Sequence, residues 1–264
     1  MPDIEMLQTA FIHWVLGTAR ILAAFVMLPV LSSQVMGGNM LKNAVALSLS
    51  LFIYPVVAGT MPDSLELMLV CTLLMKEALL GVLVGFSMAI LFWAVEAVGF
   101  FIDNQRGATM ASSLNPLSGS QTSPLGILLA QALNTLFFSG GGMLLFLGAL
   151  YQSYIMWPIG EFTPNFSPAY IQYFLHLLDL LMNLMLLVSA PIIVAMFFSE
   201  FGLAMIGRFA PQLDVFFLAM PVKSAVAFAF LVVYVGILLT FFNKEIHSLD
   251  ASFSLLFKTV FSAL

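Results

Sequence analysis

Long apolar runs, separated by short clusters of glycine, proline, asparagine and serine, account for most of the chain. The runs cover residues 7–31, 41–58, 65–102, 125–157, 171–201 and 215–242. Because Gly and Pro clusters interrupt regular structure, the pattern predicts six to seven long hydrophobic helices and an all-α fold. Proline inside a run favours a kink, and this applies to Pro29, Pro55, Pro191 and Pro221.

The run over residues 65–102 leaves two alternatives open. As one straight helix it would be about 57 Å long at about 1.5 Å per residue, roughly twice the thickness of a hydrocarbon core. It also contains Lys76, Glu77 and Glu96. The run is therefore either two helices that meet near Lys76 and Glu77 or one long kinked helix that leaves the lipid.

Composition associates these helices with a membrane. Hydrophobic residues make up 62% of the 264 positions and charged residues 8%, against about 25% charged in a typical soluble domain. The mean hydropathy is +1.08. Apolar surface of this extent is driven into lipid or against other subunits. We expect a membrane-associated protein whose residues 1–264 form one unit.

Charge and cysteine content exclude some classes of function. The net charge of -5 is spread thinly, so no basic stripe is present to bind nucleic acid. Cys71 is the only cysteine, which excludes an internal disulfide and a cysteine-based metal cluster. His13, His176 and His247 are scattered, and no catalytic triad order, Walker loop or dinucleotide fingerprint is present. We expect neither an enzyme nor a cofactor.

Six charged residues lie well inside the apolar runs, away from the ends of the runs. A charge at the centre of a lipid-bathed helix costs about 2.5–3.5 kcal/mol on insertion scales, so such residues tend to face protein or a wet cavity. They either fix helix register as paired residues or form a proton or ion path. Because Lys76 and Glu77 are adjacent, they point to different sides of a helix and cannot be assumed to pair. The six are Arg20, Lys76, Glu77, Glu96, Asp179 and Lys223.

Glycine and proline within the runs support two interpretations. Gly81 and Gly85 form a small-xxx-small pair, which lets another helix approach closely. Helices broken by Gly and Pro also occur in secondary transporters. A polytopic transporter for a small solute, with an ion-coupled site at Asp179 or Lys223, is therefore the alternative function, although the chain shows no convincing inverted repeat.

Residues 103–124 form the longest polar segment, between two strongly apolar helices. Asp103 and Arg106 are three residues apart and can pair on a continuing helical turn. Gly107 can adopt a backbone conformation closed to other residues, and Pro116 and Pro124 limit how the segment folds. The segment is either an exposed loop or an element that acts within the protein.

The sequence resembles the SctT/FliR family, which comprises export-apparatus proteins of type III secretion systems and flagella. Asp-Asn-Gln-Arg-Gly-Ala at residues 103–108 is similar to the signature of that family. The resemblance covers nearly the whole chain, keeps the order of the blocks, and is closer to the injectisome SctT (YscT-like) branch than to the FliR branch. The other supporting blocks are Leu28–Leu31, Lys76–Glu77 with Gly81 and Gly85, Ser199–Ala204, Arg208–Leu213 and Val222–Ser224.

The resemblance implies a structural subunit of the type III secretion export gate in the bacterial inner membrane. One copy would join five SctR-like and four SctS-like subunits in a closed protein-conducting channel, with part of the multi-pass assembly on the periplasmic side. An SctU-like switch protein would be the cytoplasmic neighbour, and unfolded secreted proteins would be the cargo. The fold would consist of an SctR-like part, about residues 1–200, fused to an SctS-like part, about residues 201–264.

The resemblance also implies roles for individual residues. A plug loop at residues 106–123 would keep the channel closed, with its candidate residues Arg106, Gly107, Ser112, Ser113, Asn115, Pro116, Ser118, Gly119 and Ser120. The candidates for the family motif and for assembly are Asp103, Asn104, Gln105, Arg106, Lys76, Glu77, Glu200, Arg208, Pro211 and Lys223. Gly81 and Gly85 are the helix-packing candidates.

Overall fold

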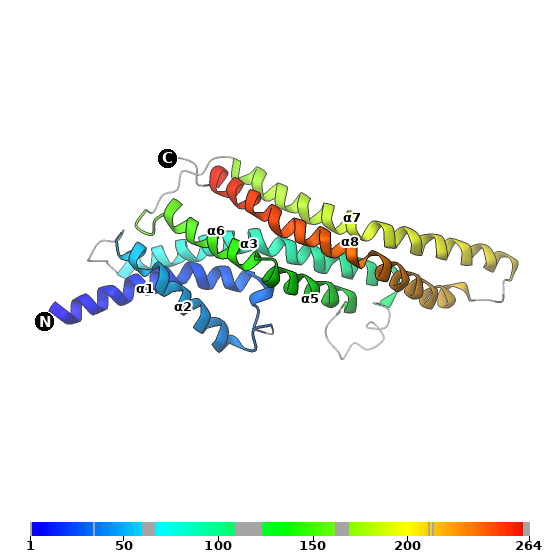
Figure 1. Cartoon of the computed structure of the whole chain (residues 1–264), viewed down its shortest axis with the longest axis horizontal. Coiled ribbons are helices and arrows are strands. Elements are labelled where there is room, and N and C mark those ends of the chain that lie inside the picture. The colour runs from blue at the N-terminus through cyan, green and yellow to red at the C-terminus, as the bar shows by residue number, and fades with distance from the viewer. Residues whose placement is uncertain are drawn as a thin grey trace. The chain divides into compact units, whose positions relative to one another are not determined.

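The fold is all-helical over the residues that the structure describes, as predicted. The computed structural model describes residues 2–33, 35–59, 67–108, 123–161, 169–210, 212 and 214–260. Within these ranges there are seven α-helices, one short 3-10 helix and no strand (Figure 1). The elements in chain order are α1 (Pro2–Met27), η1 (Pro29–Leu31), α2 (Asn39–Ala58), α3 (Leu67–Gln105), α5 (Pro124–Ser139), α6 (Gly142–Met156), α7 (Ala169–Phe209) and α8 (Val215–Val260).

Glycine, proline and serine set most of the helix boundaries. Pro29 opens η1 directly after α1. Ser123 caps α5 by accepting a hydrogen bond from the Gly126 N–H at 2.8 Å, with Pro124 at the first helical position. Gly141, with a φ of 78°, separates α5 from α6, and the two helices are bent by 70° at this break. The Gly cluster therefore ends one helix and starts the next, as its sequence indicates.

The structure fixes the extent of two helices that the apolar pattern alone leaves undecided. The run over residues 65–102 forms the single helix α3, so the alternative of two helices meeting near Lys76 and Glu77 is wrong. The mixed tail after residue 242 continues α8 to Val260. Its buried positions Leu249, Phe253, Leu256 and Phe257 recur at helical spacing, which explains why a segment with polar residues remains helical.

The chain divides into two compact units that are interleaved along the sequence. Unit 1 comprises residues 1–90, 141–177 and 247–264, and unit 2 comprises residues 91–140 and 178–246. A tilted pair of rings, Phe25 and Phe146 with centroids 6.2 Å apart, lies in the core of unit 1. The edge-to-face pair Phe92 and Phe137, at 5.2 Å, lies in the core of unit 2. This division does not test the expected boundary near residue 200, which stays a prediction.

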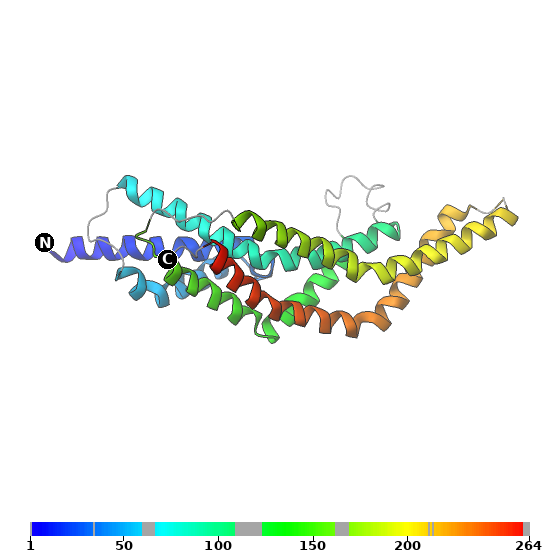
Figure 2. The same cartoon turned by 90° about the horizontal axis from the view of Figure 1, so that it is seen from above.

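Within unit 2 the long helices α7 and α8 run antiparallel (Figures 1 and 2). The two helices approach each other closely near Gly207, because a Cβ added to Gly207 would overlap the Val215 side chain. Pro191 and Pro221 lie inside α7 and α8, and each helix continues through its proline. Unit 2 is therefore built around a helical hairpin whose two arms are apolar along most of their length.

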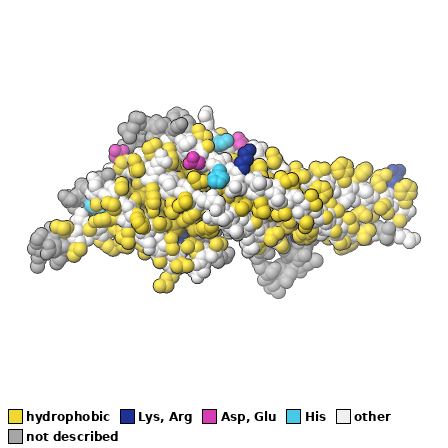
Figure 3. Space-filling view, in the orientation of Figure 1, with side chains coloured by type: hydrophobic (Ala, Val, Ile, Leu, Met, Phe, Trp, Pro, Cys, Tyr) yellow, Lys and Arg dark blue, Asp and Glu magenta, His cyan; other side chains and the backbone are white. Residues whose placement is uncertain are grey.

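Within the described part of the chain, five helices are long and apolar enough to cross a membrane, or six spans result if the bent pair α5 and α6 counts as one. Within its most apolar 18-residue window, α8 is 17% buried, α2 22% and α7 28%. Hydrophobic side chains accordingly dominate the face drawn in Figure 3, with few charged groups among them. Since exposed apolar area on this scale is unfavourable in water, these helices require lipid or other subunits around them.

Candidate functional site

Half of the charged residues singled out by sequence lie in two buried polar clusters, one in each unit. The cluster in unit 2 is centred on Asp103, in the last turn of α3, whose side chain is completely buried. Asp103 Oδ1 accepts a hydrogen bond from Arg106 Nε at 2.7 Å. Asp103 Oδ2 accepts from Ser123 Oγ at 2.7 Å and from the Leu125 backbone N–H at 3.0 Å. One carboxylate therefore joins the end of α3 to the start of α5.

The position of this carboxylate is favourable for electrostatic reasons. Leu125 lies in the first turn of α5, where backbone N–H groups have no partner within the helix. A negative charge at this end also complements the helix dipole. Asp103 thus accepts a hydrogen bond from the Leu125 N–H, which has no partner within α5, and also neutralises the charge of Arg106. The ring of contacts also joins the residues on either side of the segment 109–122.

Arg106 and Gly107 extend this cluster to α8. The Arg106 guanidinium lies over the Phe228 ring, 5.0 Å from its centroid, in a cation–π contact. Gly107 has a φ of +83°, and a Cβ at this position would lie 3.4 Å from Met220 Cγ. The αL conformation at Gly107 turns the chain out of α3. Both residues therefore fix the path of the chain where it leaves the helix.

Gly99 brings α3 and α5 into direct backbone contact. A Cβ added to Gly99 would overlap the Gly126 backbone nitrogen and Cα. No side chain larger than hydrogen fits between the two backbones at this point. Gly99 is not among the sequence-predicted packing residues. An isolated glycine in a long apolar helix is the signal that marks such a close approach.

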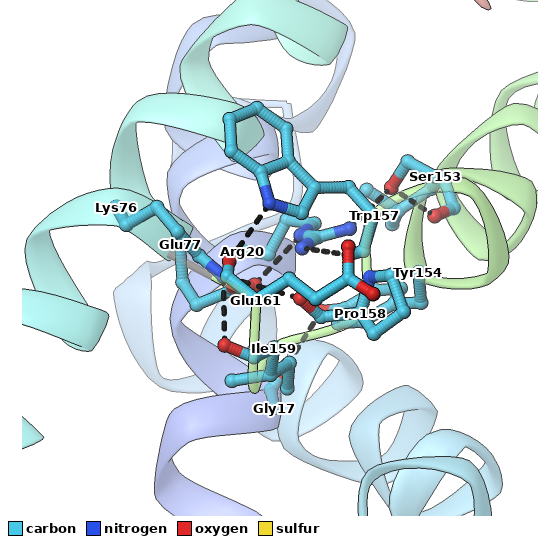
Figure 4. Close-up of polar contacts among 11 residues, drawn as sticks. Gly17, Arg20, Lys76, Glu77, Ser153, Tyr154, Trp157, Pro158, Ile159 and Glu161 are labelled. Atoms are coloured by element: carbon cyan, nitrogen blue, oxygen red, sulfur yellow. Dashed lines mark hydrogen bonds and ion pairs between the residues drawn. The ribbon is translucent and has the colours of Figure 1, made fainter. Parts of the chain in front are cut away.

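The cluster in unit 1 is centred on Arg20 of α1, which is completely buried (Figure 4). Arg20 Nε donates to Glu77 Oε2 at 2.7 Å, the NH1 group donates to Ser153 Oγ at 3.0 Å, and the NH2 group donates to the Trp157 carbonyl at 3.0 Å. The guanidinium also lies 4.1 Å from the centroid of the Tyr154 ring. Each guanidinium nitrogen therefore has a partner, which is the condition for burying an arginine.

Lys76 completes the same cluster from α3. Its ammonium donates to the carbonyl oxygens of Pro158 at 3.3 Å, Ile159 at 2.8 Å and Glu161 at 3.0 Å. Lys76 Nζ also lies 3.0 Å from Glu77 Oε1. Because the three carbonyls use its three N–H donors, Lys76 binds Oε1 by charge rather than by a hydrogen bond. The sequence alone does not indicate an ion pair between the adjacent residues Lys76 and Glu77. The pair forms because the lysine side chain is long enough to reach back to the Glu77 carboxylate.

Gly81 and Gly85 allow α3 to pack directly on α1 within unit 1. A Cβ at Gly81 would overlap the Arg20 carbonyl oxygen, and one at Gly85 would lie 2.7 Å from the Ala24 carbonyl oxygen. The close approach that their spacing allows is thus made to α1, beside the residue that carries the buried charge. The glycines and the Arg20–Glu77 pair hold the same two helices together.

The remaining sequence-predicted residues are more exposed. Lys223 Nζ lies 3.1 Å from Glu200 Oε2, and this pair links α7 and α8 within unit 2. Arg208 is exposed at the end of α7, and Asn104 and Gln105 lie in the last turn of α3. Glu96 and Asp179 are exposed. The candidates Ser112, Ser113, Asn115, Pro116, Ser118, Gly119, Ser120 and Pro211 lie outside the described residues.

The partners that come from distant parts of the chain are not indicated by the spacing of residues in the sequence. Ser153, Tyr154 and the carbonyls of residues 157–161 lie more than 80 residues from Arg20 or Lys76 in sequence. A polar Ser-Tyr pair within the apolar α6 was the available signal. Among the described residues, no group of three or more His, Cys, Asp or Glu side chains is arranged to hold a metal ion. Both clusters therefore hold helices together by hydrogen bonds and charge.

Comparison with known proteins gives a match over most of the chain. A family profile described as "Bacterial export proteins, family 1" matches residues 11–249, which include both clusters. The chain is 46% identical over 230 residues to Yop proteins translocation protein T of Yersinia pestis, covering 87% of this chain and 88% of that protein. It is 31% identical over 220 residues to surface presentation of antigens protein SpaR of Salmonella typhimurium, covering 83% and 81%. It is 29% identical over 164 residues to flagellar biosynthetic protein FliR of Bacillus subtilis, covering 62% and 63%.

Proposed function

This chain belongs to the bacterial export proteins of family 1, and we propose that it is a structural subunit of a type III secretion export gate in the bacterial inner membrane. In this proposal it forms a protein-conducting channel with SctR-like and SctS-like subunits, in a ratio of one copy to five and four. It contributes a plug at residues 106–123 and carries out no bond-making chemistry. Unfolded secreted proteins are the cargo, and an SctU-like protein is the cytoplasmic neighbour.

The relatives and the apolar helices support the coarser part of this function. The relatives are named for Yop protein translocation, presentation of surface antigens and flagellar biosynthesis. Identity is higher to the Yersinia protein than to the flagellar protein, at 46% against 29%. Five or six apolar helices long enough to span a membrane fit a multi-pass membrane protein of an export apparatus. A location of part of the assembly on the periplasmic side belongs to the proposal.

The observation that carries the plug assignment is the single carboxylate shared by both ends of the segment. Asp103 binds Arg106 before the segment 109–122, and binds Ser123 and the Leu125 N–H after it. Fixing both ends at one point restricts the segment to a closed loop and reduces the entropy that it loses on ordering. A loop held in this way can block a passage without displacing the helices that bear it.

Closed and open arrangements of such a loop need to differ by only a few kcal/mol for an arriving substrate to shift the balance. The Arg106 contact with Phe228 adds a cation–π interaction of about 0.5–2 kcal/mol to the closed side. Glycine at position 107 allows the chain to turn there without steric cost. The described residues at the base of the loop are thus suited to hold it while allowing it to move.

The two parts of the chain are also assigned by proposal. Residues 1–200 would correspond to an SctR-like part and residues 201–264 to an SctS-like part. The apolar arms of α7 and α8 support contacts with sister subunits, since so little of their surface is covered by the chain itself. The geometry does not support the alternative function of a small-solute transporter, because Lys223 is paired with Glu200 and Asp179 is exposed.

The plug assignment is tested by deleting residues 112–120 from the gate assembled with its SctR-like and SctS-like subunits. We expect the deletion to raise ion conductance across planar bilayers or reconstituted vesicles, because the passage is then no longer blocked. The matched control is Cys71→Ser, at an exposed position on α3, which leaves the assembly closed. Unchanged conductance in an assembly of normal composition contradicts the plug role.

A further inference from the structure

The exit residues Ser123 and Gly126, which follow the segment 109–122, are fixed to α3. The Ser123 hydroxyl donates a hydrogen bond to the completely buried Asp103 carboxylate at 2.7 Å. The Gly126 backbone lies directly against Gly99, where an added Cβ would overlap it. Because backbone packs on backbone at this point, no flexible side chain can yield and let α3 and α5 separate. The chain is therefore held firmly where it leaves the segment.

The entry residues Arg106 and Gly107, which precede the segment, are held by α8 as well as by Asp103. The Arg106 guanidinium lies 5.0 Å from the centroid of the Phe228 ring, and a Cβ at Gly107 would lie 3.4 Å from Met220 Cγ. The Arg106 side chain is only 10% exposed. An ion pair is stronger where it is shielded from water, whereas exposed pairs contribute little. The strength of the Asp103–Arg106 pair therefore depends on the cover that α8 provides.

The two supports on α8 belong to one stretch of helix. Lys223 lies between Met220 and Phe228 in the chain, and its Nζ pairs with Glu200 Oε2 of α7 at 3.1 Å, which sets the position of α8 along α7. The helix continues through Pro221 without a break. A hydrogen-bonded helix keeps its shape over two turns, so Met220 and Phe228 move together. Displacement of α8 from α3 therefore withdraws both supports of the entry residues at once.

We propose that α8 controls the plug through the entry residues: when α8 moves away from α3, the segment is released at Arg106 and Gly107 and stays attached at Ser123. This inference rests on the proposed function, in which residues 106–123 form the plug. Gly107 has a φ of +83°, a conformation from which glycine can turn at little steric cost. A plug released at one end remains tethered to α3, and it can return when α8 moves back.

The first test measures the ion conductance of the assembled gate in planar bilayers. Phe228→Leu removes the aromatic ring and keeps an apolar side chain. It should raise conductance about twofold to fivefold, the factor that corresponds to loss of a partly exposed cation–π contact. Phe230→Leu is the matched control, because Phe230 has nearly the same exposure, 44% against 45%, and lies about 200° away around the helix. The control should conduct as the wild type does, and an increase in both variants or in neither contradicts the proposal.

A double-mutant cycle determines whether Phe228 acts through Arg106. Arg106→Met alone should also raise conductance, since it removes both the pair with Asp103 and the contact with Phe228. If the two residues act through one contact, adding Phe228→Leu to Arg106→Met changes conductance no further. An increase equal to the product of the two separate increases would show that Phe228 acts elsewhere, and would overturn the proposal.

Amide hydrogen exchange in the same assemblies, measured by mass spectrometry, compares the entry and exit residues directly. Phe228→Leu should speed exchange of the Arg106 and Gly107 N–H groups, which bond to carbonyls at the end of α3, by a factor similar to that in conductance. The Leu125 N–H, which is bound to Asp103, should exchange at the wild-type rate. Faster exchange on both sides of the segment, or on neither, is incompatible with control by α8.

Deletion of residues 112–120, measured in the same bilayers, separates failure of this proposal from failure of the proposed function. If the deletion raises conductance and Phe228→Leu changes neither conductance nor exchange, the plug assignment stands and the role of α8 is wrong. If the deletion leaves conductance unchanged, the plug assignment is wrong and control of the plug fails with it. Met220→Ala removes the second support, so it should act as Phe228→Leu does and replaces that variant if it fails to assemble.

Discussion

At the scale of residues, the buried charge of Arg20 shows what the sequence predicts and what it leaves open. An arginine inside an apolar run is expected to face protein, and Arg20 is completely buried. Its partners Glu77, Ser153 and the Trp157 carbonyl are 57, 133 and 137 residues away in the chain. Local spacing carries no information about contacts at such separations, so only the tertiary fold identifies them.

The first prediction concerns removal of this buried charge. Arg20→Met should lower the free energy of unfolding by about 3–5 kcal/mol, because the change leaves Glu77 buried with one cation and leaves Ser153 and the Trp157 carbonyl without their donor. Denaturation of the purified chain in mild detergent, followed by circular dichroism, measures the loss.

Lys223→Met is the matched control for this prediction. Its partner Glu200 is 43% exposed, so the loss should be about 1 kcal/mol or less. Equal losses in the two variants would show that burial of the Arg20 cluster contributes nothing to stability.

The Asp103 cluster divides in the same way between local and distant contacts. The spacing of three residues predicts the Asp103–Arg106 pair, which forms with a distance of 2.7 Å. The Ser123 contact spans 20 residues, and no local spacing indicates it. A serine followed by proline is nevertheless a recognisable start of a helix, and this is the signal that places Ser123 at the base of α5.

At the scale of elements, the positions of Gly and Pro predict where one helix ends and the next begins. They predict the lengths of the helices less well. The breaks after Met27, at Gly140–Gly141 and before Pro124 coincide with such residues. The apolar pattern does not decide whether α3 continues through Lys76 and Glu77, because the cost of those charges depends on partners from α1 and from residues 157–161. The end of α8 was underestimated, because its amphipathic tail packs within unit 1.

The second prediction concerns the packing of α3 on α1. Gly81→Val should prevent the close approach of the two helices, because its Cβ would overlap the Arg20 backbone. Overpacking of this kind costs about 1–3 kcal/mol or more, and we expect low accumulation in the membrane and rapid proteolysis.

Gly236→Val is the control for Gly81→Val, since a Cβ at Gly236 meets no atom within 4 Å and the helix bears the same change in propensity. Pulse-chase measurement of both variants, expressed without the other subunits, should give a normal half-life for Gly236→Val only. A normal half-life for Gly81→Val would contradict the α1–α3 packing.

At the scale of the whole molecule, the apolar composition predicts that lipid or other subunits must cover much of the helical surface. Exposed large hydrophobic residues extend along α2, α7 and α8, and the chain buries only a small part of their apolar windows. Hydrophobicity does not show whether lipid or another subunit covers these residues, because both offer an equally apolar surface. The proposed export gate would provide SctR-like and SctS-like subunits as part of that cover.

The third prediction concerns assembly through the end of the α7–α8 hairpin. Glu200→Lys places a second cation beside Lys223, and Arg208→Glu reverses an exposed charge at the end of α7. Each should reduce co-purification with the SctR-like subunits. The conservative changes Glu200→Gln and Arg208→Lys are the controls and should assemble more nearly normally. Normal co-purification of both charge-reversed variants would remove the assembly role from these residues.

Native mass spectrometry of the protein, purified in mild detergent together with whatever remains bound to it, decides whether the chain is one subunit of a larger gate. We expect a large hetero-oligomer in which one copy of this chain accompanies several SctR-like and SctS-like subunits. A stable species at 28.8 kDa, the mass of the single chain, obtained from cells that contain those subunits, would contradict it.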